Sequence, residues 1–136
     1  MITNQSLKKG RAAEHILISN FLLWDFEVYV PVTDVKGVDI MLKNERGTYL
    51  ELQVKGRIVW NVNATFIIRE FPIKKNFFIV CYNFRSKDYF IIPSKIVAER
   101  CKKIGRIKKW FVISYSFLLK YPSCKNERGI KRLHYV

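Results

Sequence analysis

The stretch GVDIMLKNERGTYLELQVK, residues 37–55, decides the fold of this chain. Apolar residues occupy every second position over 38–43 and again over 49–55, which is the period of a β-strand with one buried face. We therefore expect two strands here, joined tightly as an antiparallel hairpin. The polar positions of the second strand share one face, and they are Glu51, Gln53 and Lys55.

The loop of this hairpin determines its register. Directly paired residues of an antiparallel hairpin point to the same side, so the two apolar faces match only if the loop has an odd number of residues. A loop at 45–47, with its glycine in the left-handed conformation, meets this condition and pairs Asn44 with Thr48. Counting back along both strands then places Asp39 opposite Gln53.

The segment from Ser6 to Trp24 has helical spacing, and Glu14 lies in the middle of its apolar arc. A carboxylate on an apolar helix face is costly unless a charge, a metal or several hydrogen bonds satisfy it. Two interpretations stay open: Glu14 has such a partner, or it lies at the margin of the face and its head reaches water. The arc itself is formed by Leu7, Leu17, Ile18 and Phe21.

The chain has 136 residues, which is the size of one domain, with a core over about 7–100 and a basic extension over about 101–136. A strand or a buried helix fits 110–115 equally well, and the tail from 125 has no clear pattern. The other expected elements are a strand at 27–32, a loop or bulge at 56–63, a strand at 65–69, a hairpin of 77–82 with 89–92, and a helix over 95–104 with Ser94 as its N-cap.

Charge is distributed unevenly along the chain, whose net charge is +14. Residues 1–70 hold nine basic and eight acidic residues, whereas residues 71–136 hold sixteen basic and three acidic residues. A phosphate-binding surface needs only the basic half, but a nuclease must combine metal-holding carboxylates with a basic cradle. A merely solubilising surface is the plainer alternative.

Other classes of protein are disfavoured. The three cysteines are far apart and form no C-x-x-C pair, so we expect reduced thiols and no structural zinc. No apolar stretch approaches the roughly 20 residues of a bilayer helix, and the N-terminus has no signal-peptide pattern. We expect a cytoplasmic protein without a membrane segment and without a small-molecule organic cofactor.

The residues around the hairpin fit the chemistry of phosphodiester hydrolysis, which needs an activated water and a cation that neutralises charge at the phosphate. Mg²⁺ or Mn²⁺ prefers oxygen ligands. Asp39 would be the principal ligand, and the Gln53 amide oxygen and Val54 carbonyl could add to it. Glu14 could hold an outer-shell water, and Lys55 could orient the attacking water. Each residue taken alone could equally be a strand-end or solvent-facing residue.

This arrangement resembles the PD-(D/E)-x-K nuclease superfamily, especially its small branch related to homing endonucleases and archaeal Holliday-junction resolvases. The resemblance implies an α/β (α+β) fold with a restriction-endonuclease-like core, in which an N-terminal helix precedes a central mixed β-sheet flanked by helices. It departs from the family at Gln53, which replaces an acid, and Glu51 could supply the missing charge. No helix is evident over 56–75, between the third and fourth core strands. The matching pieces are KGRAAE at 9–14, VYVP at 28–31, GVDI at 37–40, ELQVK at 51–55 and YFIIP at 89–93.

The resemblance implies DNA as the partner and a homodimer or homotetramer that cuts two strands. The substrate could be branched, Holliday-junction-like DNA or a specific duplex site. A non-catalytic nucleic-acid-binding protein with the same fold and an accessory subunit of a larger assembly are the alternatives. Core packing is favoured over base stacking for Trp60 and Trp110. The expected phosphate contacts are Arg100, Lys102, Lys103, Arg106, Lys108 and Lys109 in one cluster, and Lys74, Lys75, Arg85 and Lys87 in a second.

Overall fold

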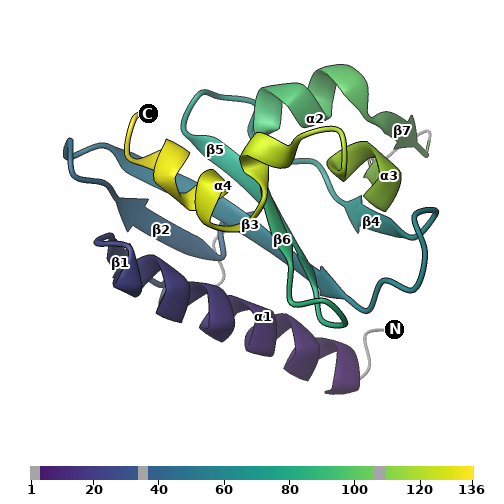
Figure 1. Cartoon of the computed structure of the whole chain (residues 1–136), viewed down its shortest axis with the longest axis horizontal. Helices are drawn as coiled ribbons and strands as arrows, with labels where there is room; N and C mark the ends of the chain where they lie inside the picture. The colour runs from purple at the N-terminus through teal and green to yellow at the C-terminus, as the bar shows by residue number, and fades with distance from the viewer. Residues whose placement is uncertain (1–3, 34–36, 106–109) are drawn as a thin grey trace.

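The computed structural model of the protein describes residues 4–33, 37–105 and 110–136 (Figure 1). A five-stranded sheet in the order β1-β2-β3-β5-β6 forms the centre, and a separate three-stranded sheet has the order β4-β8-β7. The strands are β1 (Glu27–Tyr29), β2 (Ile40–Lys43), β3 (Tyr49–Arg57), β4 (Thr65–Ile68), β5 (Phe77–Asn83), β6 (Tyr89–Pro93), β7 (Lys102–Ile104) and β8 (Trp110–Ser114). The helices are α1 (Asn4–Leu23), α2 (Ser94–Arg100), α3 (Tyr115–Leu118), the short 3₁₀ helix η1 (Pro122–Cys124) and α4 (Asn126–Leu133).

The hairpin of β2 and β3 has the register expected from the sequence. Ile40 pairs with Leu52 and Leu42 pairs with Leu50, and the Asn44 N–H donates to the Thr48 carbonyl at 3.0 Å. Gly47 in the loop has a φ of 80°, the left-handed conformation that the turn requires. The parity argument is therefore confirmed along the paired part of the hairpin.

The step from β3 to β5 joins two parallel strands, and parallel neighbours require a crossover connection. Here the crossover contains β4, which pairs with β8 in the smaller sheet. The described residues of this connection, 58–76, hold no helix, in agreement with the absence of a helical pattern over 56–75. The central sheet is mixed, as expected, because β6 then pairs antiparallel to β5.

The apolar residues of α1 recur at helical spacing, and the helix ends in a Schellman motif. Asp25 has a φ of 66°, and the Phe26 N–H donates to the Phe21 carbonyl at 3.1 Å while the Asp25 N–H donates to the Leu22 carbonyl at 3.3 Å. The rings of Phe21 and Phe26 meet edge to face at 5.9 Å, which is the apolar contact typical of this motif. Leu7, which we placed on the buried arc, is instead 55% exposed because it lies in the first turns, beyond the part of α1 that packs on the sheet.

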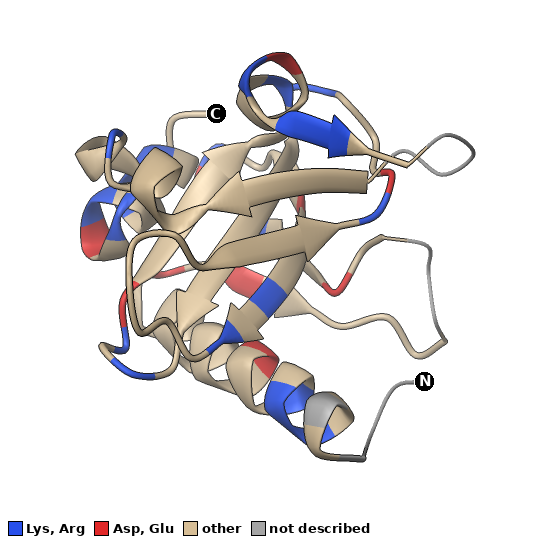
Figure 2. Cartoon of the chain, turned by 90° about the vertical axis from the view of Figure 1, so that its right-hand side faces the viewer, with Lys and Arg blue, Asp and Glu red and all other residues tan. Residues whose placement is uncertain are grey.

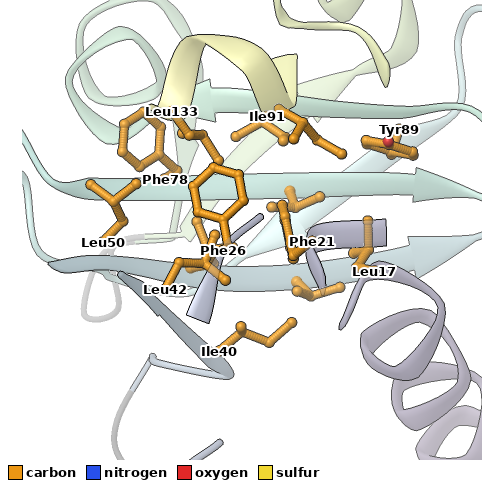
Figure 3. Packing of buried hydrophobic residues seen from close by; sticks show 14 of the residues in the cluster. Leu17, Phe21, Phe26, Ile40, Leu42, Leu50, Phe78, Tyr89, Ile91 and Leu133 are labelled. Atoms are coloured by element: carbon orange, nitrogen blue, oxygen red, sulfur yellow. The ribbon is translucent and has the colours of Figure 1, made fainter. Parts of the chain in front are cut away.

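The central sheet separates two hydrophobic clusters. On one face, α1 and α4 pack on side chains of the sheet such as Leu42, Leu50 and Phe78 (Figure 3). On the other face, β4, β8, α2 and α3 pack on the alternate residues, including Phe77 and Ile79. Strand β5 is buried along its whole length because both of its faces are covered. The α+β architecture with a flanked mixed sheet is thus the fold that the sequence predicted.

Two expected boundaries are wrong. Strand β1 ends at Tyr29 rather than at 32, because Pro31 follows and has no N–H to continue the edge ladder. Helix α2 ends at Arg100 rather than at Ile104, and the chain turns at once into β7. The antiparallel pairing of β7 with the nearby strand β8 overrides the helical pattern of this segment.

The expected cap at Ser94 is also wrong. The N-cap residue of α2 is Pro93, and it makes no side-chain hydrogen bond. The fully buried Ser94 hydroxyl instead accepts from the Lys74 N–H at 3.1 Å and donates to the Lys74 carbonyl at 2.9 Å. This pair of bonds ties the start of α2 to the chain just before β5.

The segment from 101 onward, expected as a basic extension, contributes apolar residues to both hydrophobic clusters. Segment 110–115, for which strand and helix were both open, forms β8 and the start of α3. Ile130 and Leu133 of α4 pack in the cluster beneath α1. The Asn44 side chain donates to the Leu133 carbonyl at 2.9 Å, so α4 also holds the β2–β3 turn. Among the described residues, no helix combines the length and apolarity needed to cross a membrane.

Candidate active site

Asp39 is held against β3 by two hydrogen bonds. Its N–H donates to the Leu52 carbonyl at 2.8 Å, and its Oδ2 accepts from the Val54 N–H at 2.7 Å. The carboxylate therefore lies directly beside the backbone that follows Gln53. The structure brings these two residues together, as the register argument expected.

The Gln53 side chain lies in the interior of the sheet, and the residue is 8% exposed. Its strand neighbour on β5 is Ile79, which offers no polar side-chain group. Within the described ranges, Gln53 Oε1 is buried and has no hydrogen-bond partner. A buried acceptor without a donor costs about 1–3 kcal/mol, so this oxygen needs a ligand that the described chain does not supply.

Glu14 projects from α1 with a side chain that is only 16% exposed, and Arg11 lies 3.6 Å away one turn earlier. Burial raises the pKa of Glu14 above its ordinary value, and the negative charge of Asp39 raises the pKa further. The cations Arg11 and His15 act in the opposite direction and do not cancel this rise. Glu14 and Asp39 are therefore close enough to repel one another, although they come from different elements.

Replacing Glu14 by Gln is expected to stabilise the protein at neutral pH when no metal is bound. A carboxyl whose pKa is raised by folding favours the folded state when protonated, and this contribution is lost as pH rises through its folded pKa. The gain in the free energy of unfolding should thus be present at about pH 7.5 and absent at about pH 3.5, below the ordinary Glu pKa of about 4.3. Urea unfolding in EDTA at both pH values measures it.

The exposed Glu45 in the β2–β3 turn provides a matched control. Glu45→Gln should leave the difference between the two pH values unchanged. A Glu14→Gln protein that is less stable than the parent at neutral pH would show that the Glu14 carboxylate is satisfied within the chain.

Lys55 is half-buried and lies two residues beyond Gln53 on the same strand. The next residue, Gly56, is crowded: a Cβ there would lie 2.8 Å from Phe84 Cε2 and 3.0 Å from Ala13 Cβ. The loop or bulge expected from 56 is wrong at its start, because β3 continues to Arg57. Gly56 thus admits a close packing of the protein's own side chains, and this contact places α1 beside the end of β3.

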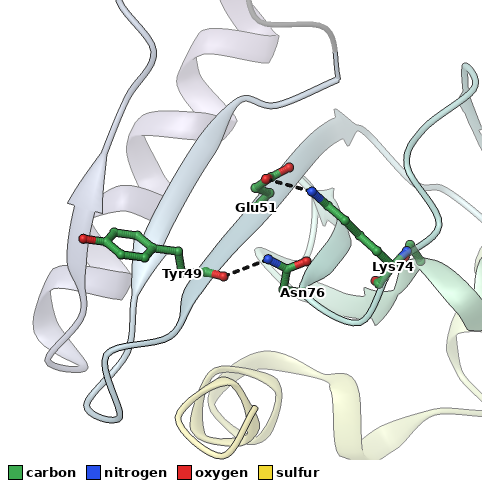
Figure 4. Close-up of polar contacts among 5 residues, drawn as sticks. Tyr49, Glu51, Lys74 and Asn76 are labelled. Carbon is green, nitrogen blue, oxygen red and sulfur yellow. Dashed lines mark hydrogen bonds and ion pairs between the residues drawn. The ribbon is translucent and has the colours of Figure 1, made fainter.

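Glu51, the alternative source of negative charge, forms an ion pair with Lys74 at 3.0 Å (Figure 4). Its side chain is 24% exposed and that of Lys74 is 44% exposed. A second bond in the same region runs from the Asn76 amide to the Tyr49 carbonyl at 3.1 Å. The structure therefore pairs two residues to which we had given separate roles, one at the metal and one on DNA.

The donor set that meets near Asp39 consists of oxygens, which suits a hard divalent cation. It combines two carboxylates that repel each other with the amide oxygen of Gln53. The described ranges hold no group of three or more His, Cys, Asp or Glu residues able to bind a metal. Glu14, Asp39 and Gln53 supply the type of oxygen donor that Mg²⁺ or Mn²⁺ prefers, with a neutral amide as the third donor.

The expected phosphate contacts are spread over several surfaces. Arg106, Lys108 and Lys109 lie outside the described residues. Figure 2 shows β7, drawn mostly in blue, at the top of the view and α1, with both red and blue segments, at the bottom. The remaining candidates are all exposed, and they are Arg100, Lys102, Lys103, Lys74, Lys75, Arg85 and Lys87.

A cavity of about 410 Å³ lies elsewhere, between β5, β6 and α4. Its wall includes Lys74, Lys95 and Arg132 around an apolar floor, and it includes none of Glu14, Asp39, Gln53 and Lys55. The candidate site, where β3, α1 and the residue before β2 meet, is thus separate from this cavity.

The sequence interpretation also placed Trp60 wrongly. We expected core packing, but Trp60 is 72% exposed. Trp110 is half-buried, and the Arg69 guanidinium lies 5.0 Å from its ring. The polar residues Asn61 and Asn63 beside Trp60 were the available signal that this segment is a surface loop.

Comparisons with solved structures show the same fold in three nucleases. A bacterial homing endonuclease is similar over 80% of this chain and 76% of its own, with a TM-score of 0.60 and 18% sequence identity. Hjc, a Holliday junction resolvase from Archaeoglobus fulgidus, is similar over 82% of this chain and 88% of its own, with a TM-score of 0.59 and 18% identity. A nuclease from a fusselovirus covers 100% of both chains, with a TM-score of 0.56 and 16% identity. No family model and no curated protein matches the sequence.

Proposed function

We propose, from the premise that this chain has the restriction-endonuclease-like fold of the PD-(D/E)-x-K nucleases, that it is a metal-dependent endonuclease acting on DNA. One observation carries the proposal: Gln53, whose buried Oε1 has no hydrogen-bond partner among the described residues, directly precedes Val54, whose N–H donates to the Asp39 carboxylate. Two carboxylates and a desolvated amide oxygen at one place are costly without a cation. The likeness to the three nucleases supports the same interpretation.

The residues of the site would divide the work as follows. Asp39, Gln53 and the Val54 carbonyl would hold Mg²⁺ or Mn²⁺, with Glu14 positioning a water in its outer shell. When bound, the ion supplies charge neutralisation at the scissile phosphate and activation of a water. Lys55 would donate a hydrogen bond to the attacking water and orient it. The hydrogen bond from the Val54 N–H would fix the orientation of the Asp39 carboxylate.

The substrate we infer is DNA, because the net charge is +14 and many lysines and arginines are exposed on the surface. Branched, Holliday-junction-like DNA and a specific duplex site are both consistent with this surface. We further propose that the protein acts as a homodimer or homotetramer, since cutting two strands requires two sites.

Cleavage assays with and without metal test the proposal. Supercoiled, linear and four-way-junction DNA should be incubated with the protein in Mg²⁺, in Mn²⁺ and in EDTA. We expect cleavage of at least one substrate in metal and none in EDTA. Intact DNA on every substrate in both metals, with binding retained, would contradict the enzyme.

Such a result would support the second candidate, a non-catalytic DNA-binding protein. Two observations favour that candidate: Gln53 carries no charge, and the nearby carboxylate of Glu51 is engaged by Lys74. Neither Gln53 nor Glu51 therefore provides a third negative charge that would strengthen metal binding. The third candidate, an accessory subunit, predicts weak DNA affinity that changes little with salt, whereas both DNA-binding candidates lose affinity steeply as salt rises.

A further inference from the structure

Trp60 lies in the loop between β3 and β4, and most of its indole ring is exposed. The Arg85 guanidinium, from the turn between β5 and β6, lies 5.0 Å from the centre of the ring. An arginine can cover one part of an indole, and the 72% exposure leaves the rest open to a ligand. Large aromatic and arginine side chains that are exposed together are typical of binding hot spots.

The loop that carries Trp60 is held on both sides of it. Val59 is 3% exposed, and its N–H donates to the buried Asn83 side chain at 3.0 Å. On the other side, the Val62 carbonyl accepts from the Ser116 N–H at 2.9 Å. The backbone is thus bonded to β5 before the ring and to α3 after it. The exposure of Trp60 is therefore built into the fold.

This ring lies near the candidate active site. The crowded contact at Gly56 joins Ala13 of α1 to Phe84 of the β5–β6 turn. In the sequence, Gly56 directly follows Lys55. Ala13 directly precedes Glu14, and Phe84 directly precedes Arg85. Trp60 also follows Lys55 by five residues, so the two Cα atoms lie at most roughly 18 Å apart. Glu14, Lys55 and Arg85 are thus each one residue away from this contact, and Trp60 lies on the chain that leaves the end of β3.

The surroundings of the pair are basic. Arg57, Arg85 and Lys87 are all exposed at this end of the sheet. The acid nearest in sequence, Asp88, accepts from the Asn126 amide at 2.9 Å and lies 3.6 Å from the Lys125 ammonium. Its charge is thus already compensated. Phosphates on either side of a nucleotide would find cations around the exposed ring.

We propose that Trp60, backed by Arg85, is a stacking platform for an unpaired base of the DNA substrate. Aromatic rings beside cations bind single-stranded nucleotides because every base has a face to stack, whereas paired bases are stacked within the duplex. The inference rests on the proposed function and narrows its substrate class to DNA with unpaired nucleotides next to the cleaved bond. A fully paired duplex cannot use the platform without unstacking a base.

Binding in EDTA tests this separately from cleavage. Fluorescence anisotropy would compare a blunt duplex with the same duplex carrying three unpaired nucleotides, for the parent and for Trp60→Ala, Trp60→Phe and Val62→Ala. Trp60→Ala should weaken binding to the DNA with unpaired nucleotides about 5- to 100-fold, the range expected for one lost base stack, and change duplex binding less than about twofold. Trp60→Phe should recover most of the affinity, because a stacking ring remains.

Val62, which is 48% exposed in the same loop, is the matched control, and Val62→Ala should bind both DNAs like the parent. Equal losses on both DNAs, or no loss on either, would overturn the platform while leaving the nuclease proposal intact. Absence of cleavage together with a selective loss in Trp60→Ala would overturn catalysis and keep the platform. A thermal melt of each variant checks that the loop substitution leaves the fold unchanged.

Discussion

Replacement of Asp39 by Asn is expected to lower the rate of DNA cleavage by about 10³-fold or more, because the candidate metal site loses its principal charged ligand. The fold should survive. An Asn oxygen can still accept the hydrogen bond that the Val54 N–H now donates to Asp39 at 2.7 Å. Initial cleavage rates in Mg²⁺ at saturating DNA measure the effect, and binding in EDTA should be retained.

Asp25→Asn is the matched control for this substitution. Asp25 is exposed and has a φ of 66°, a conformation that Asn also adopts readily. It should cleave at the parent rate. Cleavage by Asp39→Asn within about tenfold of the parent, in a range where lost catalytic groups normally cost more, would place the catalytic centre elsewhere.

Replacement of Phe21 by Ala is expected to lower the free energy of unfolding by about 3–5 kcal/mol, the usual cost of removing a buried aromatic ring. Phe21 is fully buried and contacts Phe26 where α1 ends. Removing the ring leaves a cavity and also weakens the turn that stops the helix. Urea unfolding at neutral pH measures the change.

Leu22→Ala provides the neighbouring control, because Leu22 is 56% exposed on the same helix. Its effect should stay within about 0.5 kcal/mol, as is usual for surface positions. Similar losses for the two variants would mean that α1 does not pack on the sheet as described. Because α1 also carries Glu14, a loosened helix would disturb the candidate site together with the core.

The β2–β3 hairpin could be predicted from the sequence because its information is local. Alternation over a few residues identifies each face, and the loop length then determines which residues meet. The same argument brought Asp39 to Gln53 without knowledge of the other strands. The roles given to the site residues are a different matter, and they stay predictions until cleavage is measured.

Features that depend on distant segments could not be predicted. Strand β5 is apolar throughout, so no alternation reveals its faces or its parallel pairing with β3. The Ser94 hydroxyl could bond to the Lys74 backbone only after folding had brought the two together. Trp60 was misplaced because core packing is the usual role of a tryptophan and was given more weight than the polar residues Asn61 and Asn63 beside it.

The covering of β3 on both faces has a consequence for how such a sequence can diverge. Leu52 and Val54 face one core while Gln53 faces the other side, so a one-residue insertion or deletion within β3 would exchange the core residues for the site residues. A substitution changes one residue and leaves every other residue of β3 on its own face. Related chains can therefore differ at nearly all residues while the number of residues between the core positions and the site positions of β3 stays the same. A sequence search for the spacing of these positions should find distant relatives that a search for residue identity misses.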